Sequence, residues 1–214
     1  TMAESLDFSS PQASGWKHLE FHTRSCRLHY VRQGAGPVVI LLHGWPEFWW
    51  TWHRNVPRLA QSFDVLAPDL RGFGQSEKPD GSALENYTVS HHVADLLDLV
   101  DGLKIERFGL VSHDVGAWVA QAFAREYPER LAGLFFTNCP YPGVGKRWAT
   151  ADHIPEIWYQ SFNQQPWAAE LLGRDRENCR LYFENMLSYW SYDPHAFDGQ
   201  IEHWIDNFMQ KLKK

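Results

Sequence analysis

One aspartate in the middle of the chain stands where a chemically active side chain would be presented. Asp114 lies two residues after Ser112 and two residues before Gly116, between an apolar run and an apolar stretch with helical spacing. This pattern is typical of a sharp strand-to-helix turn, in which crowded backbones require small residues and one side chain is exposed at the end of a sheet. A carboxylate at that position can attack an electrophilic carbon and form an ester on the enzyme.

Alternating strands and helices are expected to hold this aspartate in place. The apolar run at 38–42 is continuous, as in a strand buried on both faces, and residues 90–102 show apolar side chains at helical spacing. In chain order, the predicted elements are strands at 17–21, 26–32 and 38–42, a helix at 49–61, a strand at 63–67, a helix at 90–102, a strand at 108–112, a helix at 116–127 and a strand at 131–137. This alternation predicts an α/β fold with a mostly parallel sheet.

The character of the sequence changes near residue 141. Strand signals end there, and residues 150–214 have the pattern of helices rich in Trp, Tyr and Phe. We therefore expect two domains, a core over residues 1–140 and a helical cap over residues 141–214. The cap is expected to lie over the strand ends, where α/β folds bind ligands.

The overall composition of the chain excludes several classes of binding partner. The chain has 214 residues, 44% of them hydrophobic, and a net charge of −6, so a sizeable core is available and nucleic acid is not an expected partner. Three scattered cysteines show neither metal spacing nor a disulfide framework, which predicts a cytoplasmic location and no metal. No apolar run approaches the roughly 20 residues of a membrane span, and no signal peptide is visible, so no membrane partner is expected.

Three motifs occur in order, and each follows a predicted strand. They are His43-Gly44-Trp45-Pro46, the sequence DLRGFGQS at 69–76, and the segment from Ser112 to Gly116. With these motifs, nearly all of the chain resembles the α/β-hydrolase superfamily, in its Asp-nucleophile branch of epoxide hydrolases and dehalogenases. The resemblance implies an α/β-hydrolase fold with a helical cap, with the last part of the sheet absent from this chain. It also implies Asp114 as the nucleophile and no cofactor.

The same resemblance assigns roles to residues near the nucleophile. The main-chain N–H groups of Trp45 and Val115 would form the oxyanion hole that stabilises charge on the ester carbonyl. His43 is interpreted as a histidine that ties its loop to a neighbour, Asp69 and Arg71 as a structural loop pair, and His113 is not assigned an acid–base role. The expected substrate pocket comprises His43, Pro46, Trp118, Tyr141 and Trp148.

The predicted cap carries a second signal. The segment from Tyr159 to Glu170 is similar to the cap segment of epoxide hydrolases that holds a catalytic tyrosine, and the matching position is Tyr159. A phenol there could donate a hydrogen bond to the oxygen of an opening epoxide. The alternative is a tyrosine that packs among Trp158, Phe162 and Trp167. Residues 184–190, together with residues 193–197, also resemble caps of this branch, including those of haloacetate dehalogenases.

Residues next to the nucleophile discriminate between substrates. Haloacetate dehalogenases place Arg directly after the nucleophile and again three residues later, whereas this chain has Val115 and Trp118, so no forked cation is available for a carboxylate. Haloalkane dehalogenases place Trp after the nucleophile to hold the halide, and Val115 has no such donor. The balance favours a small neutral epoxide that is opened with water to a vicinal diol. The chain departs here from many epoxide hydrolases, which carry Trp at the Val115 position.

The base that the family needs has no counterpart among the eleven histidines. In the family, a histidine that activates water, an acid that orients it and a second tyrosine follow this part of the cap. Either the chain is part of a longer polypeptide, which we favour, or it is a short form that would stop at the ester. A dehalogenase of the same branch and a non-catalytic binding module remain alternatives. A serine esterase is disfavoured because no Ser lies at the apex, and a homodimer is left open.

Overall fold

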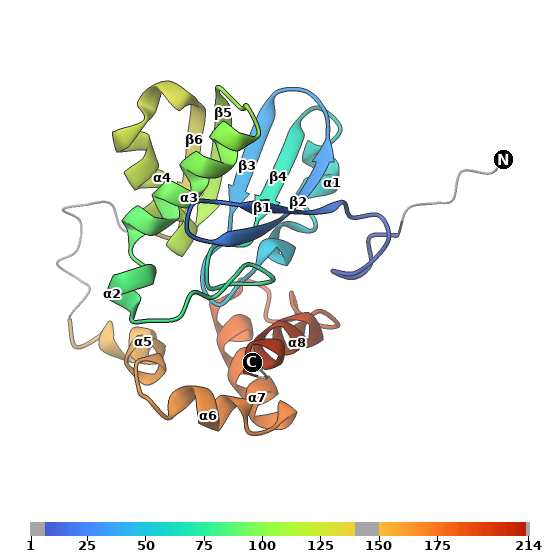
Figure 1. Ribbon diagram of the computed structural model, residues 1–214. Coiled ribbons are helices and arrows are strands. Elements are labelled where there is room, and N and C mark those ends of the chain that lie inside the picture. The colour runs from blue at the N-terminus through green and yellow to red at the C-terminus, as the bar shows by residue number, and fades with distance from the viewer. Residues whose placement is uncertain (1–6, 140–149, 213–214) are drawn as a thin grey trace. The chain divides into compact units, whose positions relative to one another are not determined.

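The computed structural model describes residues 7–139 and 150–212. Six strands form one mixed sheet in the order β1-β2-β4-β3-β5-β6 (Figure 1). Their bounds are β1 His18–His22, β2 Arg27–Gly34, β3 Val38–Leu42, β4 Asp64–Pro68, β5 Phe108–His113 and β6 Leu131–Thr137. Neighbours β1, β2 and β4 pair antiparallel, whereas β3 pairs in parallel with β4 and β5, and β5 with β6. The mostly parallel α/β fold that the sequence predicts is confirmed.

The register of β3 and β5 decides where the loops that follow them begin. Leu42, the last residue of β3, pairs with Ser112 in β5, so the two strands end at the same edge of the sheet. Because the strands are parallel, the loop that starts at His43 and the turn at Asp114 leave the sheet side by side. This carboxyl edge is where α/β folds place functional side chains.

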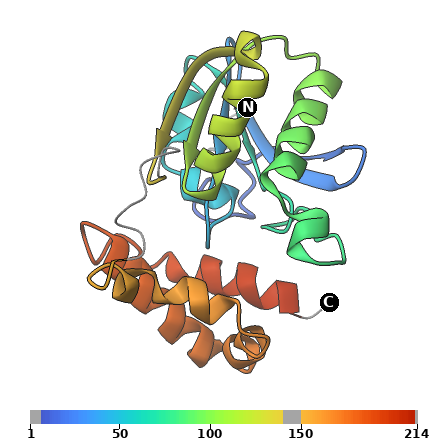
Figure 2. The ribbon, with the colours of Figure 1, turned by 90° about the vertical axis from the view of Figure 1, so that its left-hand side faces the viewer.

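Two long helices cover one face of the sheet. α3 (Val89–Gly102) and α4 (Val115–Glu126) pack against each other and against the central strands (Figure 2). The shared buried cluster includes Leu42, Leu66, Leu96, Leu99, Phe108, Leu110, Val119 and Phe123. The helices predicted at 90–102 and 116–127 are confirmed, with bounds that differ by one residue at most.

The single helix predicted over 49–61 is wrong. The structure has a 3-10 helix, η1 (Trp49–Trp52), followed by a four-residue helix, α1 (Val56–Leu59). Pro57 lies in the first turn of α1, where its missing N–H is tolerated, but it cannot continue a helix that began earlier. A further short helix, α2 (Ala83–Asn86), has no counterpart among the predicted elements, although Ser82 and Glu85 form its capping box. A one-turn η2 (Pro128–Arg130) precedes β6.

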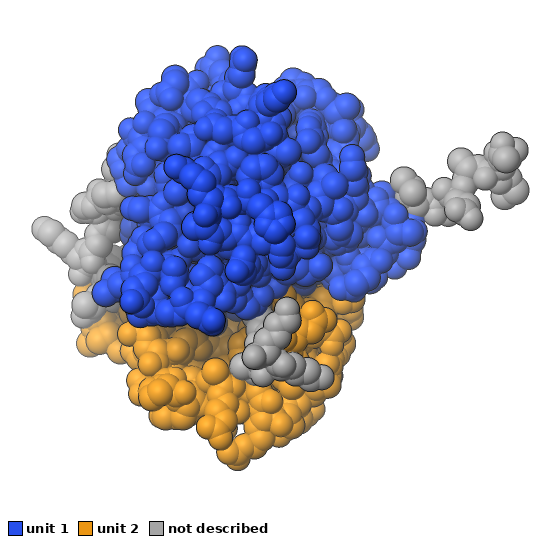
Figure 3. Space-filling view, viewed as in Figure 1, with its two compact units in different colours: residues 1–139 blue, residues 140–214 orange. Residues whose placement is uncertain are grey.

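The chain divides into two compact units, residues 1–139 and 140–214, which Figure 3 colours separately. The division falls next to the boundary expected after residue 140. The described part of the second unit contains η3 (Ile154–Ile157), α5 (Trp158–Asn163), α6 (Ala168–Gly173), α7 (Arg176–Trp190) and α8 (Ile201–Leu212). No strand occurs in this described part, which agrees with the helical composition of the sequence.

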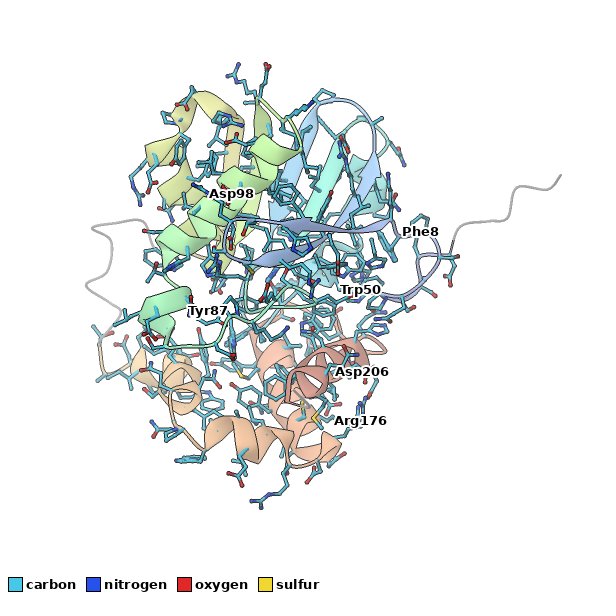
Figure 4. All side chains as sticks on the ribbon, viewed as in Figure 1. Phe8, Trp50, Tyr87, Asp98, Arg176 and Asp206 are labelled. Atoms are coloured by element: carbon cyan, nitrogen blue, oxygen red, sulfur yellow. The ribbon has the colours of Figure 1, made fainter. Side chains whose placement is uncertain are left out.

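Ionic contacts and buried apolar side chains join α7 to α8 within the second unit. Asp175 caps α7 by accepting the N–H of Asn178 at 2.8 Å. Arg176, in the first turn of α7, donates to Asp206 of α8 at 2.6 Å, and Figure 4 labels both side chains. Beneath them, Cys179, Phe183, Met186, Leu187, Trp204 and Ile205 are buried. Within the described ranges, none of the helices combines the length and apolarity needed to cross a membrane.

The sheet ends at β6 among the described residues, and this edge strand is apolar. The side chains of Leu134 and Phe135 are 37% and 62% exposed. An exposed, apolar edge strand offers unpaired main-chain groups to any further strand and therefore favours association.

Asp69 and Arg71 do not form the loop pair expected from the sequence. Asp69 binds the ring of His29 on β2, with 2.8 Å between Oδ2 and Nδ1. Arg71 instead forms a bidentate pair with Asp95 on α3, with Nε–Oδ2 at 2.6 Å and Nη2–Oδ1 at 2.7 Å. Both residues are structural, as expected, but each binds a partner that is distant in the sequence.

Replacing Arg71 by methionine should destabilise the protein by about 3 kcal/mol, because the Asp95 carboxylate would stay buried without its cation. Arg24→Met is the control, since Arg24 binds Asp98 with a side chain that is 75% exposed, and exposed ion pairs contribute little. Urea unfolding measures both variants. Equally small losses in the two variants would contradict the assignment of Arg71–Asp95 as a buried structural pair.

Candidate active site

Asp114 stands at the turn between β5 and α4, as its sequence motif predicts. Its backbone has φ 50° and ψ −115°, and a positive φ of this kind costs a non-glycine residue about 1–3 kcal/mol. A Cβ at Gly116 would lie 2.6 Å from the main-chain oxygens of Leu42 and His43. No larger residue therefore fits, and the Gly116 N–H donates to the His43 oxygen at 3.0 Å. The turn is held by the close approach of the loop after β3.

Two main-chain N–H groups point at the Asp114 carboxylate. The N–H of Trp45 donates to Oδ1 at 2.9 Å, and the N–H of Val115 also donates to this carboxylate. Trp45 lies in the loop after β3, and Val115 is the first residue of α4. The structure thus brings together on Asp114 the two residues that the resemblance assigned to an oxyanion hole.

The loop that carries Trp45 is a tight turn. The N–H of Glu47 donates to the oxygen of Gly44 at 3.0 Å, and the Trp45–Pro46 peptide is cis. A Cβ on Gly44 would collide with the side chain of Asp114. Glycine is therefore required for the loop to approach the carboxylate closely enough to donate to it.

Burial raises the pKa of Asp114 above its ordinary value, and the negative charge of Glu47 acts in the same direction. The N–H groups of Trp45 and Val115 and the charge of His113 oppose this shift without cancelling it. Asp114 consequently becomes protonated at a higher pH than an exposed aspartate does.

A second carboxylate, Glu47, lies beneath the turn and connects it to β5. Its Oε2 accepts the Gly44 N–H at 3.0 Å and lies 3.1 Å from Nδ1 of His113, while its Oε1 accepts the Thr51 hydroxyl at 2.8 Å. Burial opposes the charge on Glu47, but these hydrogen bonds and the charge of His113 outweigh it and lower its pKa. Burial likewise opposes protonation of His113, but Glu47 and Asp114 raise the His113 pKa.

Glu47 is not among the site residues that the sequence predicts. The only available signal was its position directly after Pro46 in the first motif. Its partner His113 is adjacent to Asp114 in the sequence, yet the ring turns toward Glu47 and lies within 3.3 Å of Asn138 Nδ2. The pair therefore links the Trp45 loop to the strand that carries Asp114.

His43 is fully buried and both of its ring nitrogens are bonded to the main chain. Nδ1 donates to the Gly44 oxygen at 2.9 Å, and Nε2 accepts the Leu70 N–H at 3.0 Å. The ring thereby ties its own loop to the loop after β4. These contacts favour the structural interpretation of His43 over a place on the pocket wall.

The other predicted site residues are spread over the chain. Trp118 lies in the first part of α4 and is 42% exposed. Tyr159 lies in α5 of the second unit, where its ring meets Trp190 edge-on at 4.9 Å and its hydroxyl accepts a hydrogen bond from Gln160 Nε2 at 3.3 Å. Tyr141 and Trp148 lie outside the described residues.

Metal-binding residues do not cluster in the part of the chain that the structure describes. Across residues 7–139 and 150–212, no group of three or more His, Cys, Asp or Glu side chains is arranged to hold a metal ion. The three cysteines are free thiols, of which Cys26 and Cys179 are buried. Burial raises the pKa of both buried thiols to about 11.

A model of the α/β-hydrolase fold family matches residues 37–181, which include the loop after β3, the Asp114 turn and the first six residues of α7. The chain belongs to the α/β-hydrolase fold family. This α/β-hydrolase is 32% identical over 91% of its length to epoxide hydrolase 1 of Caenorhabditis elegans, and covers 49% of that protein. It is 34% identical over 81% of its length to the soluble epoxide hydrolase of Corynebacterium sp. strain C12, and covers 60% of it.

Solved structures show the same relationship. The solved structure of the epoxide hydrolase CorEH superposes on this α/β-hydrolase with a TM-score of 0.80 at 30% identity, over 91% of this chain and 68% of CorEH. The chain spans about half of the length of the Caenorhabditis elegans protein and about three fifths of that of the Corynebacterium protein.

Replacing Glu47 by glutamine should lower the pKa of His113 toward the ordinary histidine value of about 6.5, because the charge that favours its imidazolium is removed. NMR titration of the His113 ring measures the change. Glu20→Gln is the control, since Glu20 is exposed and binds Arg27 at the surface. An unchanged His113 titration in the Glu47 variant would contradict the pairing.

Proposed function

We propose that this α/β-hydrolase opens epoxides through a covalent ester on Asp114. The observation that carries the proposal is an aspartate at the apex of the β5–α4 turn with two main-chain N–H groups on its carboxylate. The names of the relatives support the substrate class. A hydrolase with a serine nucleophile would need a hydroxyl at this apex, and Asp114 occupies it.

The first step joins the carboxylate to carbon. Oδ1 is the oxygen that the Trp45 N–H holds, so the other carboxylate oxygen attacks a ring carbon from the side opposite the epoxide oxygen. The carbon–oxygen bond of the ring breaks as the ester forms, and the alkoxide that is released takes a proton. Oδ1 becomes the carbonyl oxygen of the ester.

The second step hydrolyses the ester and regenerates the free carboxylate. Water attacks the ester carbonyl carbon, and negative charge develops on the oxygen that faces the Trp45 and Val115 N–H groups, which stabilise it. Collapse of this intermediate breaks the ester bond and releases a vicinal diol. The step also needs a base to activate water. The complete catalytic cycle is therefore part of the proposal. Alkylation of Asp114 is the step that can be tested with the 214-residue chain.

Tyr159 is proposed as the donor to the alkoxide, with residues 141–214 as the cap. A phenol suits this task because the leaving oxygen stays attached to the substrate and needs a proton, whereas a halide needs only a hydrogen-bond donor. Val115 carries no side-chain donor and Trp118 no charge, so a small neutral epoxide fits better than a haloalkane or a haloacid.

Incubation of the chain with a small terminal epoxide should add the mass of one epoxide molecule to Asp114. Intact-mass and peptide mass spectrometry at short times locate the adduct. Asp114→Asn should abolish it, whereas Asp80→Asn, a change at an exposed acid, should leave it unchanged. If neither an adduct nor a diol forms, the proposal is contradicted. Halide release from a haloalkane without any epoxide reaction would establish a dehalogenase. Binding of the epoxide without covalent change would establish a binding module.

Tyr159→Phe should slow the alkylation of Asp114 by roughly 10²-fold, which is typical of the loss of one proton donor in the transition state. The rate of adduct formation measures the effect. Tyr192→Phe removes a hydroxyl from a fully exposed tyrosine of the same unit and should have no effect. Equal rates in the wild type and the Tyr159 variant would assign that ring to packing alone.

A further inference from the structure

A row of three hydrogen bonds that the proposed reaction does not use joins the N-terminal segment to the end of β4. Nε2 of His18 is 2.9 Å from the main-chain oxygen of Pro11, and Nδ1 of His18 is 2.8 Å from Nε2 of His29. Nδ1 of His29 is in turn 2.8 Å from Oδ2 of Asp69. His29 is 2% exposed and Asp69 0%, so water does not replace any partner at the inner end of the row.

The atoms at the two ends decide how many protons the row holds. A main-chain oxygen only accepts, and so does an ionised carboxylate. Nε2 of His18 and Nδ1 of His29 must therefore both carry protons. The contact between the rings needs a third proton on one of its two nitrogens. Three protons on four ring nitrogens are one more than two neutral imidazoles carry, so the histidine pair holds one positive charge.

The surroundings of Asp69 favour its ionised form. Its Oδ1 accepts the Trp49 N–H at 2.7 Å and its Oδ2 accepts the Gln75 N–H at 2.8 Å. Burial opposes ionisation, but the hydrogen bond and charge of His29 outweigh it and lower the pKa of Asp69. The other titratable side chain that faces Asp69 is His43, whose ring is bonded to the main chain on both sides.

The same surroundings oppose a second charge on the histidine pair. Burial and the positive charge of His29 lower the pKa of His18, against the smaller effects of Pro11 and Asp69. A second proton would also place two N–H groups face to face across the 2.8 Å contact. Three ring protons, and thus one positive charge on the pair, is the number that both the hydrogen bonds and the charges allow.

The row connects three segments that are distant in the sequence. His18 starts β1 and holds Pro11 of the preceding segment, and Asp69 holds the N–H at the start of η1. Trp16, at the end of that segment, packs edge-on against Trp49 of η1, with ring centroids 5.1 Å apart. Breaking the row would therefore loosen the N-terminal segment from both β2 and η1.

We propose that the His18–His29 pair is a proton clasp, in which one shared imidazolium charge, neutralised by Asp69, fastens residues 7–17 to the sheet. The clasp makes this attachment sensitive to pH on both sides. If the pair loses its one positive charge, either two nitrogen lone pairs face each other between the rings or the hydrogen bond to Pro11 is lost. If the pair gains a second positive charge, two N–H groups face each other and the contact between the rings breaks.

The sign of the pH dependence follows from proton counting. Below about pH 6.5 both histidines of the unfolded state are imidazolium ions, whereas the folded pair carries a single positive charge. The unfolded state therefore binds more protons, and stability falls as the pH falls. Loss of the shared proton at higher pH removes one hydrogen bond of the row, so the contribution of the clasp to stability is lost there as well. The clasp contributes most near neutral pH.

Ring ¹⁵N NMR of the histidine-labelled chain near neutral pH tests the count directly, because protonated and unprotonated ring nitrogens have different shifts. His18→Gln and His29→Gln spectra assign the signals. The clasp predicts three protonated nitrogens among the four. Two or four protonated nitrogens in the wild-type protein would overturn the proposal, and this result does not depend on any variant folding.

A neutral mimic tests the consequence. In His18→Gln the amide can accept from His29 and donate to the Pro11 oxygen without titrating, so the acid-side loss of stability should become smaller than in the wild type. His22→Gln, at the exposed end of β1, should keep the wild-type dependence. Urea unfolding as a function of pH measures all three proteins. A His18→Gln profile identical to the wild type would overturn the clasp.

Discussion

The close approach of two main-chain segments at the carboxyl ends of β3 and β5 is the constraint on which the candidate site depends. Gly44 and Gly116 lie where any side chain would strike the opposite segment, and this contact brings the Trp45 N–H within 2.9 Å of Asp114. The strained backbone of Asp114 is tolerated because β5, α4 and the bond from Gly116 to His43 hold it from both sides. The parallel register of the two strands makes the approach possible.

Charge distribution distinguishes Asp114 from the other buried acids of the first unit. Asp69, Asp95 and Glu47 each bind a histidine or an arginine directly. Asp114 is held by main-chain N–H groups, and the neighbouring His113 is bound to Glu47. The consequence is opposite pKa shifts: the pKa values of Asp69 and Glu47 are lowered, whereas that of Asp114 is raised. Asp114 thus lacks the direct ion pair that the other three acids have, which is consistent with its proposed role as the group that attacks carbon.

The sequence alone predicts those features that depend on residues close together in the chain. The strands, the two long helices and the Asp114 turn follow from apolar periodicity and from small residues at fixed spacing. The helix at 49–61 was wrong because the chain forms a 3-10 helix at Trp49–Trp52 and starts a new helix at Val56, with Pro57 in its first turn. Side-chain contacts between residues that are distant in the sequence were also not predicted. Arg71 was paired with its neighbour Asp69 although it binds Asp95, and the Glu47–His113 and His18–His29 contacts leave no local pattern.

The rate of Asp114 alkylation by a small terminal epoxide, followed from acid to neutral pH, tests the central claim most directly, because only the ionised carboxylate attacks carbon. We expect a rate that rises with pH through a midpoint above about 3.9, the pKa of an exposed aspartate. A midpoint at or below that value would show that burial does not raise the pKa of Asp114. A rate that does not change with pH would contradict attack by this carboxylate.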